Sequence, residues 1–295
     1  SPKIADINRD GQMEIFIGCM DQRLYGFNSS GDILPGFPIP TQGIIRSTPA
    51  IDTNYNGLSI ITFGSDDGNL YCVTSAGKTL PGFPVNTQGS IKSSPVLADL
   101  RGDGQKYIVV FSGSGRLYVY DLQGNVVPGF PKILQQSFDA FGSFLILPSP
   151  AVADLFLDGS REIITGTIDS NLYVVTNSGK VLNGFPQKLD NLVYSSPVIS
   201  KFQDGTNKIV ITTSGGTLYI FNRDGTLFNK KKLGDEFISS PVMYDINNDG
   251  TKDIIAITSD GIIHCLNSET LSTQWEFQTV TNILSTPVIA DVTGD

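Results

Sequence analysis

The chain has 295 residues, of which 40% are hydrophobic and 17% are charged, and its formal net charge is −9. This composition supports a buried core but disfavours nucleic-acid binding, which depends on clustered lysine and arginine. The one basic run, Lys230-Lys231-Lys232, is expected to be a solvated turn. No apolar run is long enough to span a bilayer.

The three cysteines lie far apart and inside apolar, strand-like runs. They show neither the spacing of metal ligands nor an even-numbered disulfide pattern. Cys19, Cys72 and Cys265 are therefore predicted to be buried thiols.

A Ser-Ser/Thr-Pro step opens the same stretch of sequence again and again along the chain. Its prolines are Pro2, Pro49, Pro95, Pro150, Pro197, Pro241 and Pro287, which are 44 to 55 residues apart. Self-similarity at this period indicates an array of small units that share a core with their neighbours.

The third repeat shows four extended segments. They are predicted at residues 94–100, 107–111, 116–121 and 125–131, separated by glycine-rich turns. The last segment contains two prolines, so it is expected at a sheet edge. This edge segment is lost in the fifth repeat, around Leu227–Lys230, and is rewritten around Trp275 in the sixth.

Four short strands in about 46 residues match the size of one propeller blade. The predicted fold is therefore all-β, a β-propeller of four-stranded antiparallel blades in a single domain over residues 1–295; a β-solenoid is the alternative. The expected blades span 1–46, 47–92, 93–148, 149–194, 195–238 and 239–284, with the first strand of a seventh in 285–295. Seven blades are expected and eight remain possible. The abrupt ends predict a fragment of a longer chain with further domains.

Two loops between the first and second strands carry oxygen side chains in the same pattern. They span Asp6–Glu14 and Asp245–Asp253, with oxygens at positions 1, 3, 5 and 9 and glycine at position 6. Such a loop suits a hard cation, with the carbonyl of position 7 as a further ligand. Strands flank these loops, so an EF-hand is excluded. Calcium is predicted; magnesium demands stricter geometry, and a turn held by Asx hydrogen bonds is the alternative.

The other loops lose this pattern by degrees. Asp154–Glu162 lacks only the position-3 oxygen, and its candidate ligands are Asp154, Asp158, Ser160 and Glu162. The loop from Asp52 lacks carboxylates at positions 5 and 9. In Asp99–Tyr107, Arg101 stands at a ligand position and could replace the ion. The loop Ser200–Lys208 carries no ion motif.

The spacing Asp-x-Asn-x-Asp-Gly-x-x-Asp/Glu between the first two strands of a blade resembles the FG-GAP/VCBS repeat family, which includes the integrin alpha-chain propeller. The resemblance covers the whole chain as a repeat, with the ion motif intact in the first and sixth units. It implies structural calcium, placement as a secreted, cell-surface or periplasmic protein, and roles in adhesion, carbohydrate binding or assembly. The ligands it implies are Asp6, Asn8, Asp10, Gln12 and Glu14 in one loop, and Asp245, Asn247, Asp249, Thr251 and Asp253 in the other, with Gln12 and Thr251 acting through their carbonyls.

The longest repeat places its extra residues in the link between the third and fourth blades. Phe138, Phe141 and Phe144 recur there at three-residue spacing and could form an exposed, partner-binding ridge. The alternative is that the three rings cover the blades beneath and plug the channel.

Three classes of function follow from these features. The leading one is a calcium-stabilised binding, adhesion or scaffold domain for protein or glycan partners on the loop face. A secreted polysaccharide lyase or hydrolase is the rival, although the only histidine, His264, replaces a strand tyrosine and is expected to be a packed ring. A structural spacer is the third. The sequence assigns no catalytic residue, so the enzyme question stays open and leans towards no.

Overall fold

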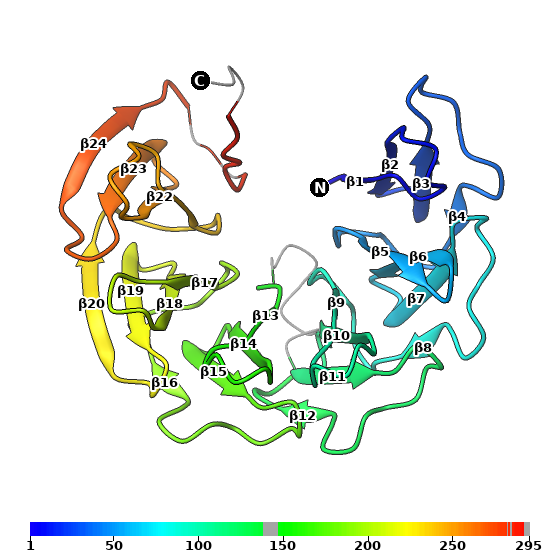
Figure 1. Ribbon diagram of the computed structural model, residues 1–295, viewed down its shortest axis with the longest axis horizontal. Helices are drawn as coiled ribbons and strands as arrows, with labels where there is room; N and C mark the ends of the chain where they lie inside the picture. The colour runs from blue at the N-terminus through cyan, green and yellow to red at the C-terminus, as the bar shows by residue number, and fades with distance from the viewer. Residues whose placement is uncertain (138–146, 282, 284, 292–295) are drawn as a thin grey trace. The chain divides into compact units, whose positions relative to one another are not determined.

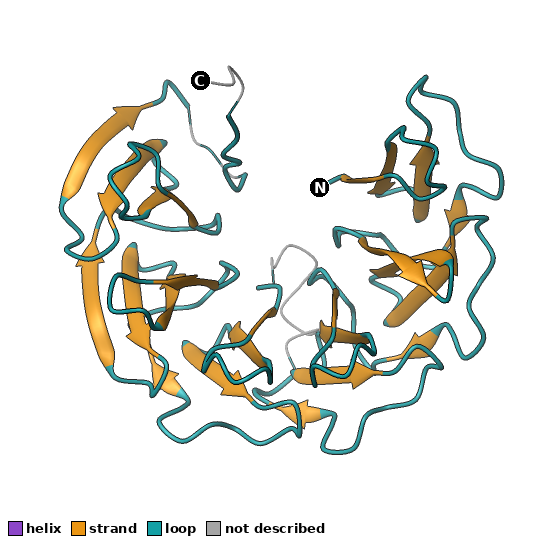
Figure 2. Ribbon diagram, viewed as in Figure 1, coloured by secondary structure: helices purple, strands orange, loops and turns teal. Residues whose placement is uncertain are grey.

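The computed structural model describes residues 1–137, 147–281, 283 and 285–291. Within these residues the chain forms six four-stranded antiparallel sheets and no helix (Figure 1 and Figure 2). It divides into two compact units, Ser1–Pro150 and Ala151–Asp295.

Each unit holds three of the sheets. The strands of the first unit are β1 (Lys3–Ala5), β2 (Glu14–Gly18), β3 (Arg23–Phe27), β4 (Ile39–Pro40), β5 (Ala50–Tyr55), β6 (Leu58–Gly64), β7 (Asn69–Thr74), β8 (Val85–Asn86), β9 (Val96–Ala98), β10 (Tyr107–Phe111), β11 (Arg116–Tyr120) and β12 (Lys132–Ile133). Those of the second unit are β13 (Ala151–Ala153), β14 (Glu162–Gly166), β15 (Asn171–Val175), β16 (Gln187–Lys188), β17 (Val198–Lys201), β18 (Asn207–Thr212), β19 (Thr217–Asn222), β20 (Leu227–Lys232), β21 (Val242–Tyr244), β22 (Asp253–Ile257), β23 (Ile262–Asn267) and β24 (Thr273–Gln278).

Every sheet follows chain order from its first strand to its fourth, and all neighbouring strands pair antiparallel. Each sheet is therefore one blade of a β-propeller, as the repeat predicts, and the sheets are called blades one to six below. Strand β10 coincides with the predicted run 107–111, and β11 with the start of the run 116–121.

The fourth strands differ from their prediction. In blade three, Val126 makes only an isolated bridge to Tyr120, a turn closes with Phe130 N–H donating to Val127 O, and pairing resumes at β12. The Pro-Gly-Phe-Pro segment is thus a turn, because its prolines donate no hydrogen bond to the neighbouring strand.

Blades five and six lack these prolines, and their edge strands are longer. The prediction that blade five loses its outer strand is wrong, because β20 is a six-residue strand that pairs with β19 along its length, with one register shift. The prediction of a lysine turn is wrong for the same reason, since Lys230–Lys232 ends β20. The Lys231 ammonium donates to Leu271 O at 2.9 Å and to Thr273 Oγ1 at 2.7 Å, which joins this edge to blade six.

The core lies between successive blades of one unit. In blade two, alternate residues of β6 face opposite neighbours: Ile61 and Phe63 pack with Phe16 of blade one, whereas Ile60 packs with Ile108 of blade three. Because side chains alternate along a strand, the central strand of such a blade is buried on both faces. The second unit repeats this arrangement between its blades.

The Ser-Ser/Thr-Pro step joins successive blades through hydrogen bonds. Thr48 N–H donates to Ser94 Oγ, and Ser94 N–H donates in turn to Ser149 Oγ, both at 2.9 Å. The preceding Ser93 hydroxyl donates to Phe111 O at 2.6 Å within its own blade. The first hydroxyl of the step thus bonds within its own blade, and the second accepts a backbone N–H from the step of the preceding blade. We call this series of N–H to hydroxyl bonds between successive steps the serine ladder.

The second unit has the same kind of ladder, which reaches Thr286. In the second unit Ser196 N–H donates to Ser240 Oγ, and Ser240 N–H donates to Thr286 Oγ1 at 3.3 Å. Residues 285–291 are not a strand, however, since no second strand within the described residues pairs with them. The expected seventh first strand is therefore present only as a step of this ladder.

The outer turns of neighbouring blades approach each other through glycine. Gly82 has φ +89°, and a Cβ at this position would lie 1.9 Å from Gln123 O in the turn of blade three. The facing Gly124 would place a Cβ 2.4 Å from Gly82 O. Equivalent pairs join blades one and two, and blades four and five: Gly36 with Gly77, and Gly184 with Gly225. No side chain fits between these two backbones.

The three cysteines differ in burial and should therefore differ in reactivity. Cys72 and Cys265 are fully buried, but Cys19 follows the end of β2 and is only partly buried, so the prediction of three buried thiols is wrong for Cys19. Burial raises the pKa of the Cys72 thiol to about 12. We expect a thiol-titrating reagent at neutral pH to modify one cysteine in the folded chain and three after denaturation. Mass spectrometry would identify the site, and rapid modification of Cys72 would contradict this packing.

Candidate cation loops

The two predicted cation loops connect β1 to β2 and β21 to β22. Their backbone conformation is shared with two further loops. Positions 4 and 6 have positive φ in blade one (Arg9 +62°, Gly11 +85°) and in blade six (Asn248 +57°, Gly250 +84°). The same two positions are left-handed in blades three and four: Gly102, Gly104, Leu157 and Gly159. One loop fold therefore serves blades one, three, four and six.

The first aspartate of each loop organises this fold. In blade one, Asp6 accepts backbone N–H groups from Arg9 at 2.6 Å, from Asp10 at 3.2 Å and from Gly11 at 3.0 Å. In blade six, Asp245 accepts N–H groups from Asp249 at 3.1 Å and Gly250 at 2.9 Å. These bonds shape the turn and leave carboxylate lone pairs unused, since each oxygen has two.

The position-5 aspartates hold the next turn of the backbone. Asp10 Oδ1 accepts the Gln12 N–H, and Asp249 Oδ1 accepts the Thr251 N–H, both at 2.7 Å. The side chain of Gln12 turns away, because its Oε1 accepts the Ser29 hydroxyl at 2.6 Å. Only the main-chain carbonyl of Gln12 thus remains for the ligand role that the resemblance implies.

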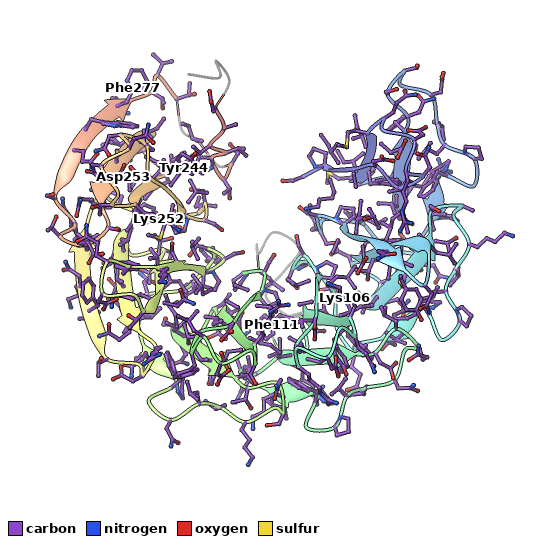
Figure 3. All side chains as sticks on the ribbon, in the orientation of Figure 1. Lys106, Phe111, Tyr244, Lys252, Asp253 and Phe277 are labelled. Atoms are coloured by element: carbon purple, nitrogen blue, oxygen red, sulfur yellow. The ribbon has the colours of Figure 1, made fainter. Side chains whose placement is uncertain are left out.

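The position-9 carboxylates are buried at the start of the second strand. Glu14 is 2% exposed and Asp253 is 0% exposed. Glu14 Oε2 accepts the Ile7 N–H at 2.8 Å, and Asp253 Oδ2 accepts the Ile246 N–H at 3.1 Å. Asp253 is labelled in Figure 3, and its second oxygen, Oδ1, accepts a hydrogen bond from Gln274 Nε2. A buried carboxylate requires such compensation or a cation.

An amide group lies among the carboxylates of each loop. Asn8 Nδ2 donates to Asp10 Oδ2 at 3.0 Å and lies 3.5 Å from Glu14 Oε1. Asn247 Nδ2 likewise donates to Asp249 Oδ2 at 3.0 Å. Among the described residues, no three His, Cys, Asp or Glu side chains are arranged to hold a metal ion. The structure does bring Asn8, Asp10 and Glu14 together in a hydrogen-bonded cluster. The oxygen atoms of this cluster are of the kind that bind a hard cation.

Blade four keeps the same cluster without the amide. Asp154 accepts the N–H groups of Asp158 and Gly159, Asp158 accepts the Ser160 N–H, and Glu162 accepts the Leu155 N–H at 3.1 Å. Burial raises the pKa of Glu162, and the neighbouring Asp158 and Asp154 carboxylates raise it further. Position 3 of this loop is Phe156, which supplies no oxygen side chain.

Blades two and three have lost the acidic position 9. Blade two closes its loop as a tight hairpin at Asn56-Gly57, and its position 9 is the buried Ile60. Blade three keeps the loop fold around Asp99, but Tyr107 replaces the carboxylate and Arg101 lies over the Tyr107 ring at 5.4 Å. The guanidinium thus stacks on the ring that replaced the acidic residue.

Blade five carries its own cation at position 9. Lys208 is 1% exposed, and its ammonium forms an ion pair with Asp204 and a 3.0 Å hydrogen bond with Thr206 Oγ1. It also lies 4.5 Å from the ring centroid of Phe228 and 5.4 Å from that of Phe202. The Lys208 hydrogen bond is the main reason that the pKa of Asp204 falls to about 2. The sequence predicted only that this loop carries no ion motif. A lysine at the repeat position that is acidic in other blades already indicates that the side chain supplies a positive charge there.

Phe138, Phe141 and Phe144 lie outside the described residues. His264 is buried and packed, as expected: its Nδ1 lies 2.8 Å from Glu276 Oε1 and its Nε2 lies 3.3 Å from Thr258 Oγ1. No helix among the described residues is long and apolar enough to cross a membrane.

Comparison with known proteins shows the fold. A family model for the lambda-carrageenase beta-propeller domain matches residues 208–293. A search of curated proteins gives no match. Among solved structures, BBS1N in complex with ARL6DN is similar with a TM-score of 0.66 at 13% identity, covering 96% of this chain and 82% of that chain. The computationally designed Ika8 protein gives 0.61 at 14% identity, covering 98% and 90%.

A third similar structure is the V. cholerae biofilm matrix protein Bap1. Its TM-score is 0.62 at 17% identity, covering 80% of this chain and 40% of that one. At such identities the likeness concerns architecture only. Together with the six antiparallel blades, these matches show that the chain has a β-propeller fold.

Proposed function

We propose that this chain is a calcium-stabilised β-propeller of a secreted, cell-surface or periplasmic protein, which acts as a binding or scaffold domain for protein or glycan partners. The position-9 residue carries this proposal. Where it is acidic and buried, as at Glu14 and Asp253, it adds a carboxylate to the other oxygen-bearing side chains of the loop. Where it is Lys208, a built-in ammonium lies beside the loop carboxylate. Blade five thus has its own positive charge at this position, and a bound cation would supply the equivalent charge in blades one and six.

The residues proposed to hold calcium are those of the FG-GAP/VCBS-type pattern, Asp6, Asn8, Asp10, Gln12 and Glu14, and Asp245, Asn247, Asp249, Thr251 and Asp253. When bound, calcium would supply positive charge to the buried carboxylates and fix the first turn of each blade. Blade four offers a weaker set, Asp154, Asp158, Ser160 and Glu162. Millimolar calcium outside the cytoplasm suits exposed loops of this kind, which supports the proposed location.

Calcium removal should lower the thermal stability of the chain. A ligand that binds only the folded state at 100 times its Kd adds about 2.7 kcal/mol, so we expect chelator to reduce Tm by several degrees. The double variant Asp10→Asn/Asp249→Asn should lose most of this calcium response. Asp103→Asn, at the same position of the blade-three loop, is the matched control and should keep it. An identical Tm with calcium and with chelator would refute the calcium proposal.

The binding role is tested separately from the metal. Glycan-array and pull-down experiments with the whole chain should retain a protein or polysaccharide ligand. Absence of any ligand, in calcium and without it, would leave no support for a binding domain.

An enzyme acting on polysaccharide is the second candidate, favoured by the match of residues 208–293 to the lambda-carrageenase propeller domain. Turnover of lambda-carrageenan or of acidic polysaccharides by the purified chain would support it. The one histidine of the chain, His264, is buried and hydrogen-bonded to Glu276, so it is not placed to act as an acid or base on a polysaccharide, and the binding role is preferred.

A further inference from the structure

A pocket of about 510 Å³ lies between blades two and three, at the end of the blades that carries the loops. Its walls are the β5–β6 hairpin, the loop that leads into β10, and the turn after β11. This volume falls in the range of roughly 300–1,000 Å³ that is typical of small-molecule sites. All of the lining residues belong to the first unit.

Blade two contributes a hairpin to this pocket in place of the loop found in blades one, three, four and six. The pairing of β5 with β6 shifts register between Asp52 and Tyr55, and Tyr55 pairs with Leu58 before the Asn56-Gly57 turn. In blade one the position-1 aspartate accepts three backbone N–H groups, whereas Asp52 accepts one, from Asn54 at 2.8 Å. The oxygens of this degenerate loop are thus available to line a cavity.

The lining contains both negatively and positively charged groups, and both hydrogen-bond acceptors and donors. Asp52 supplies a carboxylate, and Lys106, labelled in Figure 3, supplies an ammonium. Asp121 adds a second negative charge, but both of its oxygens already accept hydrogen bonds within its own turn, from the Gln123 and Asn125 N–H groups and from Asn125 Nδ2. Among the described residues Lys106 makes no ion pair. The amide side chains of Gln105 and Asn56 can both donate and accept.

The walls are held in place from both sides. Tyr55 packs against the core between blades two and three, and its hydroxyl accepts Gln123 Nε2 at 3.2 Å. From blade one, Arg9 Nη2 donates to Thr53 O at 2.6 Å and to Asn54 Oδ1 at 2.9 Å. Arg9 is position 4 of the first cation loop, so that loop supports the rim of the pocket.

We propose that this pocket binds a neutral saccharide unit, a specific form of the glycan-binding role proposed above, on which it rests. Sugar hydroxyls donate to carboxylates and accept from ammonium and amide groups, which matches this mixed lining. A phosphate or sulfate would meet Asp52 and Asp121 in a chain of net charge −9. An organic cation would meet Lys106, and a wholly apolar ligand would leave Asp52 and Lys106 without polar partners.

Ligand-observed NMR titration of the whole chain with cellobiose, maltose and lactose tests this assignment. At least one disaccharide should bind, and Asp52→Asn or Lys106→Ala should each weaken it by about tenfold or more, as expected for losing a charged hydrogen bond. Asp260→Asn and Lys180→Ala, exposed residues elsewhere, are the matched controls and should leave the Kd unchanged. Asn at position 52 keeps the acceptor for Asn54 N–H, and melting curves would show that each variant is folded.

Two results would overturn the saccharide site: no disaccharide binds, or both pocket variants bind as well as the wild type. Preferential binding of galactose 4-sulfate or inorganic phosphate would also overturn it. Polysaccharide retained equally by wild type and pocket variants would reject this pocket but leave the binding domain standing. If no disaccharide, polysaccharide or protein is bound at all, both proposals fail, whatever calcium does to the Tm.

Discussion

Gly82→Ala is expected to lower the free energy of unfolding by about 3–5 kcal/mol and the Tm by on the order of 10 °C. Two effects add. Gly82 has φ +89°, which costs any L-residue energy, and the new Cβ would lie 1.9 Å from Gln123 O. Because that oxygen belongs to the backbone of the next blade, relief requires the two blades to move apart. Thermal and urea denaturation of the whole chain would measure the loss.

Gly104→Ala is the matched control for the backbone effect alone. Gly104 has φ +82°, but a Cβ there would have nothing within 4 Å. We expect this variant to lose about 1 kcal/mol. Equal losses at the two positions would mean that close approach between the blades is not why glycine stands at position 82.

Lys208→Glu is expected to lower the free energy of unfolding by about 3–5 kcal/mol. The substitution replaces a buried ammonium with a buried carboxylate beside Asp204, and the Phe202 and Phe228 rings then face a negative charge. Lys208→Met keeps the apolar stem without the charge and should lose less. Lys201→Glu, an exposed residue of the same blade, should change stability by about 0.5 kcal/mol or less. Denaturation midpoints of the three variants would rank them, and equal values for positions 208 and 201 would contradict the role of the buried Lys208 ammonium.

The same pair gives a pH dependence with a defined sign. The folded pKa of Asp204 is about 2, below its ordinary value of 3.8. A lowered carboxylate pKa stabilises the folded state above pH 4, and this contribution is lost as the pH falls from about 4 to 2. In Lys208→Met that part of the acid transition should become smaller, because the main cause of the lowered Asp204 pKa is gone and only the Thr206 hydrogen bonds remain.

The blades could be predicted because their information is local and repeated. A buried strand such as β10 reads as an unbroken apolar run between glycine turns, and the repeat period then fixes the architecture. Edge strands were harder. Val126 and Val127 resemble a strand, but a proline follows them and removes a donor, so pairing moves to Lys132–Ile133. In blade five no proline interrupts the fourth strand, so β20 forms directly where the sequence predicted its loss.

The candidate site was predictable as a set of loops but not as an arrangement. Spacing placed Asp6, Asp10 and Glu14 in one loop, and the structure joins Asp10 and Glu14 through the Asn8 amide. Spacing could not show that Asp6 would accept backbone N–H groups, nor that Lys208 would take the cationic role within its own blade. The saccharide pocket was invisible for another reason. Its walls come from positions far apart in the sequence, and its residue types are common in turns.

The serine ladder has a consequence for how such a protein can change its length. Thr48 donates its amide hydrogen forward to Ser94, and Ser94 donates forward to Ser149, so the bonds point one way along the chain. A duplicated copy of one whole repeat would bring its own donor and its own acceptor, and would leave neither neighbour with an orphaned group. A copy of only part of a repeat would leave either a backbone N–H donor or a hydroxyl acceptor without its partner. Growth by gene duplication is therefore tolerated in integral steps, with polarity preserved at every junction.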